Sequence, residues 1–138
     1  MEKLAVGIIG FGRIGAEHAH WLTPSTAAHV TQIFDATPAR RDLATALGFQ
    51  CAPSFEALLA ADSVEAVLIA VPTSMHFDLA IESLRAGKHV MIEKPMAIDL
   101  SQAKLIAAQA DRQKKIVSVF HNRRWDVDFL TVRQAIAA

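Results

Sequence analysis

Short apolar runs that alternate with helical patterns are the feature that most constrains the fold of this chain. Five such runs, rich in Val and Ile, are predicted to be strands: residues 4–9, 30–34, 64–71, 89–92 and 116–120. Because consecutive residues in these runs are apolar, both faces of each strand should be covered, as in a parallel sheet. The alternation predicts a doubly wound, mainly parallel α/β sheet, with ligands at the carboxyl ends of its strands.

The intervals between these runs carry the start and stop signals of helices. The predicted starts are Thr37 with Pro38, Ser54, Thr73 or Ser74, and Asp99 with Gln102 three residues on. The predicted terminators are Gly48 and Gly87. Apolar stripes should face the sheet at Leu43, Ala44 and Leu47, at Phe77, Ile81 and Leu84, and at Ala103, Ile106, Ala107 and Ala110. A last helix should run from about Asp126 to Ala138 without a stop signal.

The composition argues against several classes of function. Lys plus Arg and Asp plus Glu balance at 14 each, so no charge excess favours nucleic acid or an anionic membrane as partner. No apolar run approaches the roughly 20 residues of a membrane helix, and the start does not resemble a signal peptide. The single cysteine, Cys51, excludes an internal disulfide, and we therefore expect a cytoplasmic protein.

A glycine motif follows the first predicted strand. Residues 10–15 read G-x-G-x-x-G and open a predicted helix, which is the context that the dinucleotide-binding fingerprint requires. Gly10 permits a tight turn, Gly12 lets the backbone approach a pyrophosphate, and Gly15 lets helix and strand pack closely. The whole turn, with Phe11, Arg13 and Ile14, is predicted to bind cofactor, against the alternative of a glycine-rich turn without a ligand.

A single acid, Asp35, follows the second predicted strand, 20 residues beyond Gly15. This is the expected place for a carboxylate that accepts hydrogen bonds from the hydroxyls of an adenosine ribose. Its charge would repel a 2′-phosphate and so favours NAD, although Arg40 or Arg41 could reach such a phosphate and leave NADP possible. The alternative is that Asp35 only caps the helix that starts at Pro38.

Two later strand ends add candidate contacts. Pro72 and Thr73 close one strand and border the expected cofactor crevice, although Thr73 could instead only cap the next helix. Two roles are open for His76: a solvated helix residue, or a residue that contacts ribose or substrate. Glu93, Lys94 and Pro95 end the strand at residues 89–92, and the bond between Lys94 and Pro95 is a candidate for cis geometry.

Lys94 is either a surface lysine after a strand or a residue that takes part in proton transfer. Near a nicotinamide ring its ammonium would exchange a proton with the alcohol being oxidised and stabilise the developing alkoxide. Glu93 would orient Lys94 or bind the nicotinamide ribose.

The glycine motif, the run HFDLAIESLRAGKHVMIEKPMA and the run FHNRRWDVDFLTVR together resemble the amino-terminal half of the Gfo/Idh/MocA oxidoreductases. The likeness extends over essentially the whole chain. It implies a Rossmann domain in which Lys94 is catalytic or close to the cofactor. It also implies that His121, Asn122 and Arg123 border the nicotinamide, whereas the residues alone indicate a solvated charged loop.

The resemblance also implies a missing part. Family members continue into a second α/β domain that builds the substrate pocket, and its Asp–His pair four positions apart has no counterpart here. We therefore expect a cofactor domain at residues 1–122 and the start of a connecting helix at residues 123–138. The chain should bind NAD without efficient turnover on a sugar or polyol, because nothing in it orients a substrate. Apolar residues of the last helix should promote self-association.

Other interpretations rank lower. His18 and His20 stand two apart on a predicted helix and cannot share a metal, so no metal site is expected. Cys51 is not expected to be a nucleophile, because no histidine and acid are matched to it in the sequence. It is predicted to be a packing residue in a short strand. A non-catalytic NAD-sensing or protein-interaction module is the main rival, and Lys94 after Glu93 favours the enzyme. A dehydrogenase of the glucose-6-phosphate type is disfavoured because Met96-Ala97-Ile98 replaces an expected glycine.

Overall fold

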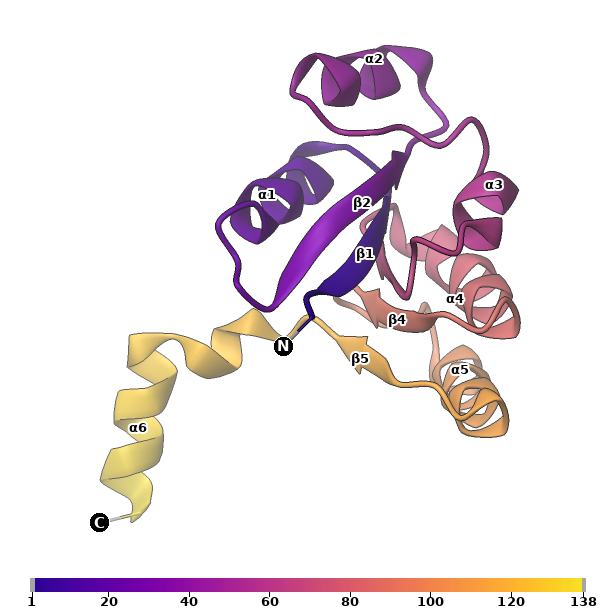
Figure 1. The fold of residues 1–138 in the computed structure, drawn as a ribbon. Helices are drawn as coiled ribbons and strands as arrows, with labels where there is room; N and C mark the ends of the chain where they lie inside the picture. The colour runs from indigo at the N-terminus through magenta and orange to yellow at the C-terminus, as the bar shows by residue number, and fades with distance from the viewer. Residues whose placement is uncertain (1, 138) are drawn as a thin grey trace.

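The computed structural model describes residues 2–137 and has a five-stranded parallel sheet at its centre (Figure 1). The strands lie in the order β2-β1-β3-β4-β5. Their bounds are Leu4–Ile9 (β1), Ala28–Phe34 (β2), Ala66–Ile69 (β3), His89–Ile92 (β4) and Val117–Val119 (β5). All pairings are parallel, so the predicted fold class is confirmed and all five carboxyl ends lie along one edge.

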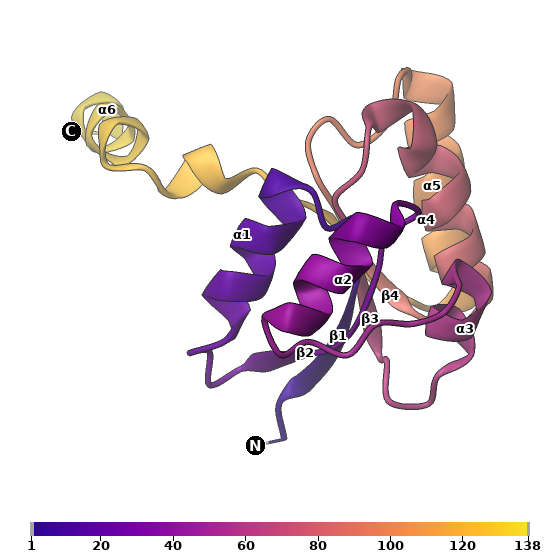
Figure 2. The same ribbon diagram turned by 90° about the horizontal axis from the view of Figure 1, so that it is seen from above.

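Helices cover both faces of this sheet. Their bounds are Arg13–Leu22 (α1), Pro38–Ala46 (α2), Phe55–Ala60 (α3), His76–Arg85 (α4), Leu100–Gln113 (α5) and Val127–Ala137 (α6). Figure 2 shows α1 and α2 on one side of the strands and α3, α4 and α5 on the other. Two 3₁₀ turns, Thr73–Met75 and Asn122–Trp125, precede α4 and α6.

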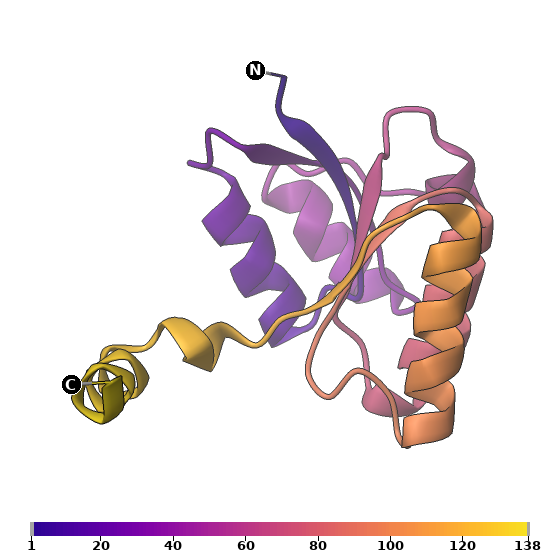
Figure 3. The same ribbon diagram turned by 90° about the horizontal axis from the view of Figure 1, so that it is seen from below.

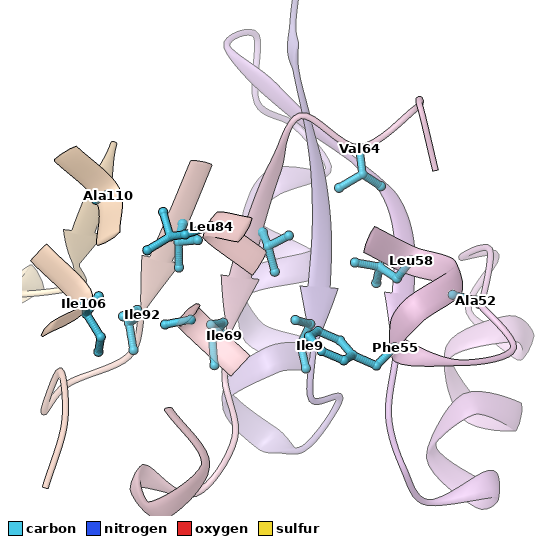
Figure 4. Close-up of a cluster of buried hydrophobic side chains, with 13 residues drawn as sticks. Ile9, Ala52, Phe55, Leu58, Val64, Ile69, Leu84, Ile92, Ile106 and Ala110 are labelled. Carbon is cyan, nitrogen blue, oxygen red and sulfur yellow. The ribbon is translucent and has the colours of Figure 1, made fainter. Parts of the chain in front are cut away.

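Alternate residues of the same strand supply the two layers of the core. Ile8 and Leu68 pack with α1 and α2, whereas Ile9 and Ile69 pack under α3, α4 and α5 (Figure 4). All four residues of β3 are buried, as expected for a central parallel strand. Since burying one such side chain contributes about 1.5–3 kcal/mol, this double-sided core holds the strand ends in place.

Most of the predicted element ends are confirmed. The side chains of Ser54 and Asp99 accept hydrogen bonds from backbone N–H groups of the helices that they cap. Gly48 and Gly87 have positive φ angles of 89° and 76°, so both terminators are confirmed. The strand predicted at residues 64–71 is shorter: β3 covers only Ala66–Ile69, and Val64 is buried outside it. Cys51 forms a single parallel bridge with Ile33 and is half-buried.

Parts of the predicted apolar stripes are wrong. Leu43 and Leu47 are exposed, because only the side of α2 that carries Ala44 packs against the sheet. On α5, Ala107 is exposed although it was predicted to face the sheet, and Gln109, which was not, is buried. The buried side of α2 carries only Ala44, and that of α5 includes the polar Gln109, which an apolar pattern does not predict.

Helix α6 leaves the layered body. Figure 3 shows it projecting beyond α1, away from the sheet. None of its described residues is buried, and Val127, Val132 and Ile136 are exposed. No helix within residues 2–137 has the length and apolar character needed to cross a membrane.

Gly15→Ala should lower the free energy of unfolding by about 1–3 kcal/mol, the usual range for overpacking. A Cβ atom at Gly15 would lie 1.9 Å from the carbonyl oxygen of Gly10, so backbone must move. Gly12→Ala is the matched control, because its Cβ would meet nothing closer than 3.6 Å. Urea unfolding followed by circular dichroism measures both, and equal stability of the two variants would contradict this packing.

Candidate cofactor site

The loops that follow the strands meet at one edge of the sheet. The glycine turn follows β1, Asp35 follows β2, and Glu93 with Lys94 follows β4. Direct contacts join them: the Phe11 N–H donates to Asp35, and His18 of α1 bonds to Glu93. The predicted convergence of these three segments is therefore present.

The glycine turn has geometric reasons for two of its glycines. Gly10 has a φ angle of +92°, and a Cβ atom there would lie 2.4 Å from the Ala70 carbonyl oxygen. Gly15 lies against the carbonyl of Gly10, as described above. Both the tight turn and the close packing predicted from the motif are confirmed. At Gly12 a Cβ atom would meet only the guanidinium of Arg40, so this position faces open space.

The start of α1 offers N–H groups for which the described part of the chain supplies no side-chain cap. Gly12 is the N-cap and supplies no side-chain cap, and the first turn contains no acidic residue. The first N–H groups of a helix have no partner within it and carry partial positive charge. This end of α1, which begins at Arg13 and Ile14, is thus suited to an anion such as a phosphate.

Asp35 is a buried acceptor of hydrogen bonds. The residue is 4% exposed, and its carboxylate accepts from the Phe11 N–H at 2.7 Å and the Thr37 N–H at 2.8 Å, while Arg40 donates at 3.4 Å. Burial alone would raise the pKa of this carboxyl. The hydrogen bonds from Thr37, Phe11 and Arg40 outweigh it, and the pKa of Asp35 is lowered. Asp35 thus bonds both to the glycine turn and to Thr37, the N-cap of α2.

A cavity of about 170 Å³ lies beside Asp35, between the ends of β1, β2 and β3. Four of the predicted site residues line it: Gly10, Asp35, Arg40 and Pro72. Met75 and Leu79 also line it, and neither was predicted to lie at this site. Thr73 does not contribute to its lining. The site thus offers an apolar slot with one carboxylate at its rim, next to the open end of α1.

His76 differs from one of its two predicted roles. Its side chain is 1% exposed, so it is not a solvated helix residue. Nε2 lies 2.9 Å from the Val71 carbonyl oxygen, and Nδ1 lies 2.9 Å from that of Pro95. Both ring nitrogens thus lie at hydrogen-bonding distance from backbone carbonyl oxygens, and a contact of His76 to ribose or substrate stays a prediction. His76 joins the loop after β3 to the loop after β4.

The segment after β4 presents one free cation. The bond between Lys94 and Pro95 is cis, which confirms the expectation. Lys94 is exposed, and within residues 2–137 its ammonium makes no hydrogen bond or ion pair. Glu93 accepts from the Lys94 backbone N–H at 3.2 Å and lies 2.7 Å from His18 Nε2. His18 is a site neighbour that the sequence did not reveal.

The segment after β5 begins beside α1, where Phe120 meets the His18 ring, and then continues into α6. Asn122 and Arg123 are exposed in the 3₁₀ turn that leads to α6. The guanidinium of Arg123 donates to Asp126 at 2.7 Å, and this hydrogen bond raises the pKa of Arg123. A role of these residues beside the nicotinamide stays a prediction. No group of three metal-ligating side chains occurs in the part of the chain that the structure describes.

Comparison with known proteins identifies the family. The model of the Gfo/Idh/MocA family, described as an oxidoreductase family with an NAD-binding Rossmann fold, matches residues 4–121. The chain belongs to this family. The fold and the glycine turn of this Gfo/Idh/MocA chain are therefore those of a domain that binds a nicotinamide dinucleotide.

Three relatives show what this chain is similar to. An inositol 2-dehydrogenase of Rhizobium meliloti is 35% identical over 94% of the chain, which covers 39% of that protein. A scyllo-inositol 2-dehydrogenase (NADP(+)) of Bacillus subtilis is 29% identical over 99% of the chain and 38% of that protein. The crystal structure of an NAD-binding protein from Listeria innocua has a TM-score of 0.95 and 37% identity, over 99% and 40% of the two chains. The chain spans about two-fifths of the length of these relatives.

Asp35→Asn should lower the free energy of unfolding near neutral pH by about 1–3 kcal/mol, because buried N–H groups lose a charged acceptor. Since the pKa of Asp35 is lowered by folding, its contribution is complete above the ordinary carboxyl pKa of about 3.9. It is lost as the pH falls through the lowered value. Urea unfolding should show a gap between the two proteins that is constant near neutral pH and closes in strong acid. A gap of the same size in strong acid would contradict the assignment.

Proposed function

We propose that this chain is the cofactor-binding part of an NAD(P)-dependent oxidoreductase that acts on a sugar, a polyol or a related hydroxy or keto compound. The observation that carries the proposal is the shared edge, where the open end of α1, the Asp35 carboxylate and the free Lys94 ammonium follow three strands of one parallel sheet. In open α/β sheets ligands bind in the crevice at this edge.

The cofactor would lie along this edge. Its pyrophosphate would bind the N–H groups at the start of α1, and its adenosine would enter the cavity beside Asp35. The lone pairs that Asp35 has left would accept hydrogen bonds from the ribose hydroxyls. When bound, the nicotinamide would accept or supply the hydride.

NAD is the preferred cofactor in this proposal. The ionised Asp35 would repel a 2′-phosphate at close range in a partly buried site. Arg40 reaches Asp35 only at 3.4 Å and is half exposed, so it could turn to a phosphate. The similarity to a dehydrogenase that is named for NADP(+) keeps that cofactor as the second candidate.

Lys94 is the residue that would exchange the proton. Its ammonium is exposed and free of protein partners within the described residues, so a substrate hydroxyl can reach it. A positioned acid or base of this kind contributes about 10²–10⁴ to a rate. The substrate class rests on the relatives named for inositol. Glu93 would lie at the same end, beside the nicotinamide ribose.

A second candidate is a binding module that senses the dinucleotide without turning over a substrate. It would need the glycine turn and Asp35 but not Lys94. The remaining expectations also stay predictions: a domain boundary near residue 122, a cytoplasmic location and self-association. The exposed apolar residues of α6 support the last of these.

Titration calorimetry should show that the protein binds NAD more tightly than NADP. Asp35→Ala should lower the affinity for NAD by about tenfold, because a charged acceptor of the ribose hydroxyls is lost. NADP affinity should fall less, since the repulsion is relieved at the same time. Arg40→Ala, which removes a charge from the same cavity, is the comparison. Unchanged NAD affinity in Asp35→Ala would refute the placement of the ribose.

The 138-residue chain should bind NAD without reducing it when polyols are added, because nothing in the described residues orients an alcohol at Lys94. In any longer form that turns over, Lys94→Met should lower kcat by about a hundredfold or more and leave NAD affinity nearly unchanged. Absorbance of the reduced nicotinamide measures turnover in both experiments. A fully active Lys94→Met enzyme would favour another proton-transfer group.

A further inference from the structure

His18 and Glu93 form a partly buried pair between α1 and the end of β4. His18 Nε2 lies 2.7 Å from Glu93 Oε1, and the two side chains are 4% and 15% exposed. The residues are 75 positions apart, so only the fold brings them together. Within residues 2–137, this side-chain hydrogen bond directly joins α1, the helix after the glycine turn, to the Glu93–Pro95 segment.

Aromatic rings fix the imidazole in place. The ring of Phe120 meets His18 edge to face at a centroid distance of 4.6 Å, and Trp21 does so at 5.3 Å. Trp21 and Phe120 stack on each other at 6.3 Å. These rings hold the imidazole in one orientation and keep water from its hydrogen bond, which strengthens that bond.

The carboxylate of Glu93 is consequently held at both oxygens. Oε1 is bonded to His18, and Oε2 accepts the backbone N–H of Lys94 at 3.2 Å. The pair therefore fixes the backbone of Lys94 through its neighbour while the Lys94 side chain stays free. A rotation of Glu93 would release both contacts together.

A purely structural role accounts poorly for this pair. A buried ionisable pair is weak evidence for stability, because apolar residues of similar volume often stabilise a core as well or better. Here apolar rings already surround His18 on two sides. What an apolar residue could not do is hold a carboxylate in one orientation at the edge where Lys94 emerges.

We propose that His18 is a positioning residue for the reaction, which holds the Glu93 carboxylate at the nicotinamide end of the cofactor site. The inference rests on the proposed function and adds to it the residue that orders its reacting end. His18 would act only through Glu93, without touching cofactor or substrate. Its loss should therefore affect the nicotinamide half of the dinucleotide and spare the adenosine diphosphate half.

The test compares two amide substitutions of the same chemistry. The amide nitrogen of Gln reaches the place of Nε2, whereas that of Asn stops near Nδ1. His18→Asn should lower the affinity for NAD by about tenfold and leave the affinity for ADP unchanged. His18→Gln should bind NAD as the unaltered protein does. His20→Asn, an exposed change two residues along α1, is the matched control. Calorimetric titration with NAD and with ADP measures each affinity, and thermal unfolding checks the fold.

Each outcome separates the two proposals. Equal effects of His18→Asn on NAD and ADP, or none on either, would overturn the role of His18 while dinucleotide binding by the unaltered protein upholds the proposed function. Failure of the unaltered protein to bind either ligand would overturn both. If His18→Asn does not fold, Glu93→Gln gives the test from the other side of the pair: loss of NAD affinity alone supports the inference, and equal loss of both ligands contradicts it.

Discussion

The close approach of α1 to the end of β1 is the constraint on which the site depends. The backbone at Gly15 lies so near the Gly10 carbonyl that no side chain fits between them. This contact places the start of α1 at the carboxyl edge of the sheet, and the first N–H groups of a helix have no partner within the helix. An anion proposed to bind at that place would need only main-chain N–H donors and no charged side chain.

Buried polar groups then tie the neighbouring loops to this turn. Asp35 accepts the Phe11 N–H, His76 joins the loops after β3 and β4, and His18 holds Glu93. Such groups are costly to bury without partners, and no buried side-chain nitrogen or oxygen within the described residues lacks one. The edge of the sheet is thus ordered by hydrogen bonds, whereas its interior is ordered by apolar packing.

Local signals explain how much could be predicted from the sequence. The existence of the five strands, the caps at Ser54 and Asp99 and the glycine turn depend on neighbours within a few residues, and the structure confirms them. The roles of His18 and His76 could not be predicted in this way, because Glu93 lies 75 residues from His18 and Pro95 lies 19 from His76. The exposure of Leu43 likewise reflects which side of α2 meets the sheet, and that is a tertiary property.

A crystal structure of the protein grown with NAD tests the central claim most directly. The account predicts that the pyrophosphate lies within hydrogen-bonding distance of the N–H groups at the start of α1. It also predicts the adenosine ribose on Asp35 and the nicotinamide on the side of Lys94. NAD bound at another edge of the sheet, with the glycine turn empty at saturating concentration, would contradict it.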